Sequence, residues 1–296
     1  MSRHGPDFIC VGMPKTGTGW LFDQLESHPD FWMPPVKELL YLNQEVPRLQ
    51  FLEDRSWRAL ERARNNTKKK VSERVLRREV SAPRDIEFIN YARSIRGLPR
   101  DIGRYAQLFR CKGELLSGDI TPPYWSLDEA TISSVATELP GAKILLLVRD
   151  PVARAWSRIS VLYRNNNFDP NMLEDRSRFE SLLRKSKKIG GLLATEVAQN
   201  WLRHLEAKNF KVVFFDDIAE VPQNTRADVL RFLGADPDKP GKPLPPDYNR
   251  KADYKKLDLT DGAKAALSEH FRDEIVASAE LFGGRAREWP ARYGLS

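Results

Sequence analysis

The chain has 296 residues, of which 41% are hydrophobic and 30% are charged, and its formal net charge is +7. This length suits one large α/β domain or two small ones, and the excess of positive charge favours anionic partners such as nucleotides, acidic glycans, nucleic acid or a membrane surface. Two cysteines, Cys10 and Cys111, are too few for a disulfide framework and are expected to be free thiols. No apolar run approaches the ~20 residues of a membrane span and no signal peptide is visible, so we expect a cytoplasmic protein.

A strand, a glycine-containing loop and a helix are expected in turn at the start of the chain. Residues 8–12 form a continuous apolar run, which is typical of a strand buried on both faces of a parallel sheet. The loop Pro14-Lys15-Thr16-Gly17-Thr18-Gly19 follows, and apolar residues then recur at helical spacing until His28-Pro29 ends the helix. This order predicts the first half of a βαβ unit.

Apolar strands alternate with helices along the rest of the chain. Strands are predicted over 143–148 and 211–215, and helices over 152–164, 192–207, 225–233 and 260–282. This alternation predicts a single α/β domain over residues 1–296, with a central parallel sheet between two layers of helices, a three-layer sandwich like that of P-loop NTPases. Residues 45–100 are rich in Arg, Lys and Glu, and we expect a helical insert there that contributes to an acceptor site.

The loop after the first strand has the composition of an anion site. A glycine-rich turn before a helix presents backbone N–H groups to an anion, and the helix dipole adds to the attraction. Lys15 precedes Gly17, whereas the lysine of the NTPase loop G-x-x-x-x-G-K-[ST] follows the second glycine, and this argues against ATP chemistry. A tight turn with a surface lysine is the alternative. The N–H donors would come from Thr16, Gly17, Thr18, Gly19 and Trp20, with hydroxyl donors from the two threonines and a positive charge from Lys15.

A second anion site is predicted where the strand over 143–148 ends. Arg149 lies at the carboxyl end of this strand, which is the edge where open α/β sheets bind ligands, and its guanidinium could hold a phosphate bidentately. Ser157 lies eight residues on, about two turns into the next helix, and its hydroxyl could face the same anion. The residues alone leave another interpretation open, in which Arg149 pairs with Asp150 and Ser157 is a surface serine.

Both segments resemble the nucleotide-binding motifs of sulfotransferases that use 3′-phosphoadenosine 5′-phosphosulfate (PAPS). Residues 14–18 resemble the family's 5′-phosphosulfate loop, and residues 149–157 resemble its 3′-phosphate motif, in which the arginine and the serine bind the 3′-phosphate. The resemblance therefore implies PAPS as the donor, held by Lys15, residues 16–20, Arg149 and Ser157, and adenosine 3′,5′-bisphosphate (PAP) as the product. The family usually has a second threonine where this chain has Gly19, so one hydroxyl contact is missing here.

Further segments resemble the branch that includes glycan sulfotransferases of the heparan type. Pro35-Val36-Lys37-Glu38 resembles a Lys-Glu motif whose glutamate is the proposed base, and residues 118–124 resemble a Gly-Glu-x-[ST]-Pro-x-Tyr segment. The resemblance implies that Glu38, Lys37 and Tyr124 contact the acceptor. Asn249-Arg250-Lys251 resembles a late basic loop, which implies that Arg250 and Lys251 close over the donor. The chain departs from the branch at Leu40 and Ile120, where histidine and lysine are common.

The reaction implied by the resemblance is in-line sulfuryl transfer to a hydroxyl or amine of a carbohydrate or glycan-like acceptor. Glu38 would take the acceptor proton, Lys15 would stabilise the leaving group, and no metal ion is required because cationic side chains can take its place. The acceptor itself and the oligomeric state are not fixed by the sequence.

Two other functions were weighed. A P-loop nucleotide or small-molecule kinase would need a lysine after the second glycine and a carboxylate for Mg²⁺, which Asp216 or Asp217 after a strand could supply. A non-catalytic nucleic-acid-binding protein would suit the net charge, but the chain has 41 acidic residues and shows no basic motif interleaved with aromatic residues. We therefore expect a nucleotide donor and no nucleic-acid partner.

Overall fold

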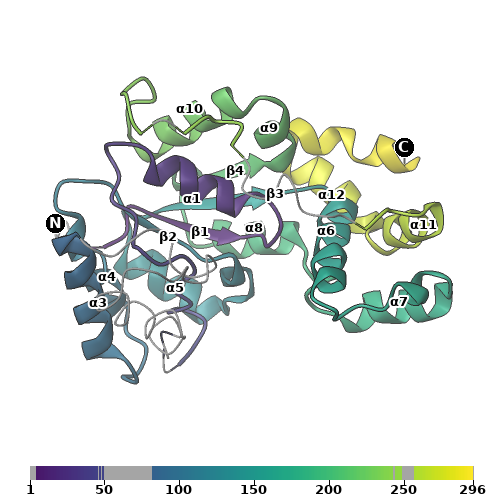
Figure 1. Ribbon diagram of the computed structural model, residues 1–296, viewed down its shortest axis with the longest axis horizontal. Coiled ribbons are helices and arrows are strands. Elements are labelled where there is room, and N and C mark those ends of the chain that lie inside the picture. The colour runs from purple at the N-terminus through teal and green to yellow at the C-terminus, as the bar shows by residue number, and fades with distance from the viewer. Residues whose placement is uncertain are drawn as a thin grey trace, which may run out of the picture.

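The computed structural model describes residues 5–45, 47, 49, 82–242, 244–248 and 257–295. Its centre is a sheet of four parallel strands in the order β2-β1-β3-β4 (Figure 1). The strands are β1 (Phe8–Gly12), β2 (Gly118–Ile120), β3 (Lys143–Val148) and β4 (Phe210–Phe214). Three of them were predicted from their apolar runs, and the parallel sheet is confirmed.

Strand β2 is too short and too polar to show as an apolar run in the sequence. It pairs with β1 over the residues Phe8 to Cys10, and it contains one aspartate among its three residues. Gly118 is required where β2 passes β1, because an added Cβ would overlap the backbone and ring of Phe8. Close backbone approach, and not hydrophobic patterning, therefore specifies this strand.

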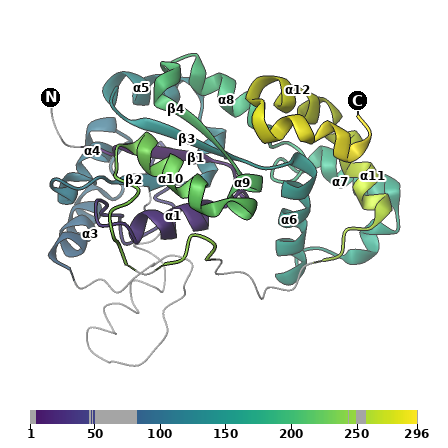
Figure 2. The ribbon, with the colours of Figure 1, turned by 90° about the horizontal axis from the view of Figure 1, so that it is seen from above.

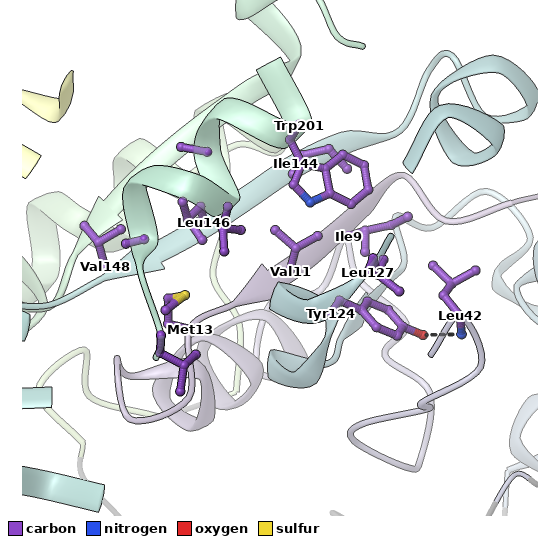
Figure 3. Packing of buried hydrophobic residues seen from close by; sticks show 14 of the residues in the cluster. Ile9, Val11, Met13, Leu42, Tyr124, Leu127, Ile144, Leu146, Val148 and Trp201 are labelled. Carbon is purple, nitrogen blue, oxygen red and sulfur yellow. Dashed lines mark hydrogen bonds between the residues drawn. The ribbon is translucent and has the colours of Figure 1, made fainter. Parts of the chain in front are cut away.

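Alternate residues of the strands enter two separate hydrophobic clusters, one on each face of the sheet. Phe8, Cys10, Leu145 and Leu147 belong to one cluster, and the residues between them belong to the other. Figure 3 shows part of the second cluster, in which Trp201 lies beside Ile144 at one end of the row Ile144, Leu146 and Val148. Since both faces of β1 and β3 are buried, these two strands have continuous apolar sequences.

Helices cover both faces and complete the predicted three-layer arrangement (Figures 1 and 2). The first face is covered by α1 (Thr18–Glu26), α9 (Phe215–Glu220) and α10 (Pro222–Leu233). The larger cluster takes side chains from α3 (Pro83–Ile95), α4 (Ile102–Gln107), α5 (Glu129–Glu138), α6 (Pro151–Arg164), α7 (Arg176–Lys185), α8 (Ala194–Leu202), α11 (Asp261–His270) and α12 (Arg272–Phe282). Within the described residues, no helix has the length and apolar character needed to cross a membrane.

The helix boundaries differ from the prediction in three places. The single helix expected over 260–282 is divided at Phe271, whose φ of −101° and ψ of 12° lie outside the helical range while its ring is buried. The helix expected over 192–207 is the shorter α8, and α10 starts earlier than expected, with Pro222 in its first turn. Of the insert expected over 45–100, α3 is helical, and residues 51–81 lie outside the described residues.

Candidate active site

The loop between β1 and α1 is braced by its own side chains. Its chain leaves β1 with a hydrogen bond from Met13 N to Leu147 O of 2.8 Å. Thr16 is fully buried, and its hydroxyl donates to the Met13 carbonyl oxygen across 2.6 Å. Lys15 and Gly17 both have left-handed backbone conformations, with φ of 74° and 95°. Thr16 was expected to donate its hydroxyl to the nucleotide, but this hydroxyl donates within the loop, so the residue offers its backbone N–H only.

The N-terminus of α1 lacks a side-chain cap. The N-cap residue is Gly17, and the first hydrogen bond of the helix runs from Leu21 N to Gly17 O across 3.1 Å. The helix therefore leaves the N–H groups of Thr18, Gly19 and Trp20 without intrahelical acceptors. Such a set of N–H groups at the positive end of the helix dipole is suited to an anion.

Arg149, from the second predicted anion site, lies next to the loop that forms the first. Its Nη1 donates to the backbone carbonyl oxygen of Lys15 across 3.3 Å, and its guanidinium carbon lies 4.1 Å from the centre of the Phe215 ring. Phe215 also approaches Gly17, where an added Cβ would lie 3.4 Å from the ring and 2.9 Å from Ile218 Cδ1. One aromatic ring at the start of α9 thus contacts both motifs.

The alternative in which Arg149 pairs with Asp150 is not observed. Among the described residues, Arg149 has no ion pair within 4.0 Å, and Asp150 instead caps α6 by accepting from Val152 N at 2.9 Å and Ala153 N at 3.2 Å. Burial lowers the pKa of Arg149, which nevertheless remains a cation at neutral pH. Ser157, the partner predicted for Arg149, lies partly exposed on α6.

Lys37 contacts both Glu38, the predicted base, and Thr18 at the end of the loop. Its ammonium group is buried and lies 3.3 Å from Thr18 Oγ1 and 3.4 Å from Glu38 Oε1. Glu38 itself has a left-handed backbone, with φ of 67°, and its side chain is 45% exposed. A half-exposed carboxylate beside the positive end of α1 can be reached by an acceptor molecule, whereas Lys37 is held between Glu38 and the loop.

Tyr124 was predicted to contact the acceptor, but its side chain is fully buried. Its hydroxyl donates to Asp119 Oδ2 across 2.7 Å and accepts from Leu42 N across 3.4 Å. Asp119 also accepts from the hydroxyls of Thr121 at 2.6 Å and Tyr105 at 3.1 Å. Tyr124 therefore accepts a hydrogen bond from the segment that follows Glu38, and its side chain has no exposed surface that an acceptor could contact.

Arg250 and Lys251 lie outside the described residues, but the chain on either side of them is anchored at the site. Trp20 Nε1 donates to the carbonyl oxygen of Pro246 across 2.5 Å, and Trp156 Nε1 donates to that of Leu257 across 2.8 Å. Trp20 belongs to α1 and Trp156 to α6, so Pro246 and Leu257 are held against the helices that carry the two predicted anion motifs.

Sequence reasoning missed Phe215 and the C-terminal residues Arg292 and Tyr293. Tyr293 Oη donates to Asp150 Oδ2 across 2.7 Å, and Arg292 Nη2 lies 2.8 Å from Asp216 Oδ1. Phe215 was predicted as the last residue of a strand, but the structure ends β4 at Phe214 and starts α9 at Phe215. No signal in the sequence links the C-terminus to Asp150, since the contact depends on tertiary packing.

The family model that matches this chain is described as "Sulfotransferase family" and covers residues 6–239. The chain belongs to the sulfotransferase family. It is therefore a sulfotransferase, and the kinase and nucleic-acid-binding alternatives are set aside. A comparison with curated protein sequences finds no significant match.

Solved sulfotransferase structures share the fold at low sequence identity. A sulfotransferase from Alicyclobacillus acidocaldarius superposes with a TM-score of 0.62 at 22% identity, covering 98% of this chain and 99% of the other. The sulfotransferase domain of the Synechococcus PCC 7002 olefin synthase gives 0.50 at 19% identity, covering 96% and 97%. Mouse SULT7A1, solved in complex with PAP, gives 0.50 at 14% identity, covering 98% and 89%. These likenesses support the fold, and the site rests on the geometry above.

Proposed function

We propose that this sulfotransferase uses PAPS as its donor and releases PAP. The observation that carries the proposal is the 3.3 Å contact between Arg149 Nη1 and the Lys15 carbonyl oxygen, by which Arg149 lies beside the loop between β1 and α1. A donor that is phosphorylated at both the 3′ and the 5′ position presents two anionic groups to such a pair of sites. The PAP complex of mouse SULT7A1, a protein of similar fold, supports the same assignment.

The residues present fit this donor. The uncapped N–H groups of α1 would receive the 5′-phosphosulfate, together with Lys15 and the hydroxyl of Thr18. Arg149 and Ser157 would receive the 3′-phosphate, and the face of Phe215 keeps the guanidinium in place. Arg250 and Lys251 remain predicted donor contacts. PAPS supplies the activated sulfuryl group.

The acid–base step belongs to Glu38. Its carboxylate would accept the proton of the acceptor hydroxyl or amine, and Lys37 would hold the carboxylate beside the α1 N-terminus through the 3.4 Å contact. Lys15 would stabilise the negative charge that develops on the leaving nucleotide, so no metal ion is needed for this role. Since the buried Lys37 contacts both Thr18 and Glu38, it fixes the distance between the donor loop and the base.

The acceptor is proposed to be a carbohydrate or a glycan-like molecule. The support is the Lys37-Glu38 motif with the segment 118–124, which resemble the glycan branch, and the net charge of +7, which suits an acidic glycan. The segment 45–100 remains a predicted contributor to the acceptor site.

The donor is tested by titration calorimetry with PAP and, separately, with ATP and Mg²⁺. We expect PAP to bind and ATP–Mg²⁺ to bind much more weakly, since the loop has no lysine after Gly17. Equal affinity for the two nucleotides, or none for PAP, would contradict the donor assignment. The acceptor is then found by screening labelled PAPS against polysaccharides, lipid-linked sugars and small hydroxylated metabolites.

A further inference from the structure

The C-terminal end of the chain lies against the residues that flank Arg149. Arg292 and Tyr293 belong to a short 3₁₀ helix (Pro290–Tyr293), beyond residue 239 where the family match ends. Tyr293 Oη donates to Asp150 Oδ2 across 2.7 Å. Arg292 reaches two carboxylates, with 2.8 Å from Nη2 to Asp216 Oδ1 and 3.7 Å from Nη1 to Asp150 Oδ2.

Both of these carboxylates are close to Arg149 and withdrawn from water. Asp150 follows Arg149 in the chain, and Asp216 follows Phe215, whose ring lies against the guanidinium. The exposed fractions of the two carboxylate side chains are only 3% and 10%. Charges in such surroundings interact strongly because water screens them little. Without compensation, both would attract Arg149 and repel an incoming phosphate.

Arg292 supplies that compensation. Its guanidinium is shared between Asp216 and Asp150, and it is oriented from the solvent side by Glu288, whose Oε2 lies 3.2 Å from Nη2. Burial raises the pKa of Asp150, while the Tyr293 hydroxyl and the charge of Arg292 act in the opposite direction and favour its ionised form. Asp150 is thus held by Tyr293, Arg292 and the first N–H groups of α6, and Asp216 is held by Arg292. Arg149 instead donates to Lys15 O across 3.3 Å.

Resting on the donor proposed above, we propose that Arg292 and Tyr293 are positioning residues that neutralise and hold Asp150 and Asp216, and thereby keep Arg149 available to the 3′-phosphate. The affinity for the donor then depends on a C-terminal segment that the family match does not reach. Arg292 acts through charge and Tyr293 through one hydrogen bond, so their contributions can be separated by substitution.

The test measures PAP affinity by calorimetry in the full-length chain. Arg292→Gln should weaken PAP binding by roughly tenfold, the usual effect of one charge lost at this range. Tyr293→Phe should weaken it less. The double variant Arg292→Gln/Asp216→Asn should bind nearly as tightly as the wild type, because the uncompensated carboxylate is gone. A residue that served only to hold the segment in place would not be rescued by removing the charge of Asp216.

Arg285→Gln is the matched control. Arg285 is also a C-terminal arginine and pairs with Asp217 at 2.7 Å and Glu220 at 2.6 Å on the same helix α9. It shares Glu288 with Arg292, at 3.3 Å, but it forms no ion pair with Asp150 or Asp216. Its loss should leave PAP affinity unchanged. Equal weakening by Arg285→Gln and Arg292→Gln would show a general loss of C-terminal packing and would overturn the inference.

Two further variants keep the test decisive if Arg292→Gln does not fold. Arg292→Lys retains the charge and should retain most of the affinity, and Asp216→Asn alone should tighten PAP binding several-fold by removing a negative charge beside Arg149. Unchanged affinity in Asp216→Asn, or failed rescue in the double variant, overturns the inference. Absence of PAP binding by the wild type defeats the proposed function instead, so the two failures are distinguishable.

Discussion

Arg149 donates from Nη1 to the backbone carbonyl oxygen of Lys15 across 3.3 Å, so the two predicted anion-binding motifs of this sulfotransferase are hydrogen-bonded to each other. The contact joins the end of β3 to the loop that starts α1, and the ring of Phe215 lies beside both. A ligand that binds at one motif therefore meets the other already in place, which lowers the entropy lost on binding.

Removing the charge of either motif should weaken donor binding. We expect Arg149→Ala and Lys15→Ala each to raise the Kd for PAP by at least about tenfold, or ~1.4 kcal/mol, since charge-assisted bonds to phosphate are lost. Calorimetry provides the measurement. Arg176→Ala is the control, because Arg176 is exposed on α7 and pairs only locally with Glu180. Unchanged PAP affinity in both site variants would contradict the nucleotide site.

Glu38→Gln should separate chemistry from donor binding. We expect turnover to fall by roughly 10²–10⁴-fold, as general-base catalysis is removed, with the Kd for PAP nearly unchanged. Steady-state rates with an accepted acceptor and calorimetry with PAP measure the two effects. Glu45→Gln, on the exposed continuation of the same segment, should behave like the wild type. Normal turnover in Glu38→Gln would show that another group takes the proton.

The buried carboxyl of Asp119 should make stability depend on pH. Burial raises its pKa to about 6 although the hydroxyls of Thr121, Tyr124 and Tyr105 donate to it. In the unfolded chain the pKa is about 3.9. Between these values the folded state binds more protons, so the contribution of Asp119 to the free energy of unfolding is greatest at low pH and falls as the pH rises through 6, by up to about 3 kcal/mol.

Comparison with Asp119→Asn isolates this contribution. Urea unfolding at pH 5 and pH 7.5 should show the wild type losing stability relative to the variant as the pH rises. The amide replaces an acceptor of the three hydroxyls, so the variant will differ from the wild type at every pH, and the readout is the slope of the difference. A difference that stays constant would mean that Asp119 is ionised throughout the range.

Two glycines of the loop should respond in opposite ways to alanine. Gly17 has a φ of 95°, and an added Cβ would lie 2.9 Å from Ile218 Cδ1, so Gly17→Ala should destabilise the protein by about 1–3 kcal/mol. Gly19 lies in the first turn of α1 with no atom within 4 Å of an added Cβ, so Gly19→Ala should stabilise by up to about 1 kcal/mol. Denaturant unfolding of the two variants measures these changes in stability. Equal changes in Gly17→Ala and Gly19→Ala would contradict the loop conformation.

Gly19 also allows a gain in donor affinity. The 5′-phosphosulfate motif that this loop resembles has a threonine at this position, and the space around an added Cβ is open. Gly19→Thr should therefore tighten PAP binding several-fold by adding a hydroxyl donor worth about 1 kcal/mol. Gly19→Val, which has nearly the same shape without the hydroxyl, is the control, and equal affinity of the two variants would show that the hydroxyl makes no contact.

The sequence predicted the parts of the fold and site that depend on local patterns. Buried strands such as β3 show as apolar runs, and two anion sites were predicted from the loop after the first strand and from Arg149 at the carboxyl end of β3. Strand β2 and the Asp150 contacts of the C-terminus were not predictable, since they depend on close packing between distant segments. The motif around Tyr124 suggested that this residue contacts the acceptor, but the sequence does not show where the side chain points. In the structure it is buried against Asp119.

The position of β3 in the sheet has a consequence for how the enzyme fluctuates. This strand is hydrogen-bonded to β1 on one side and β4 on the other, and helices cover both of its faces. Its amides should therefore exchange with solvent only when the whole domain unfolds, whereas amides around the half-exposed Glu38 should exchange through smaller openings. The end of β3 that leads into Arg149 would then stay rigid through local motions around Glu38, the predicted base.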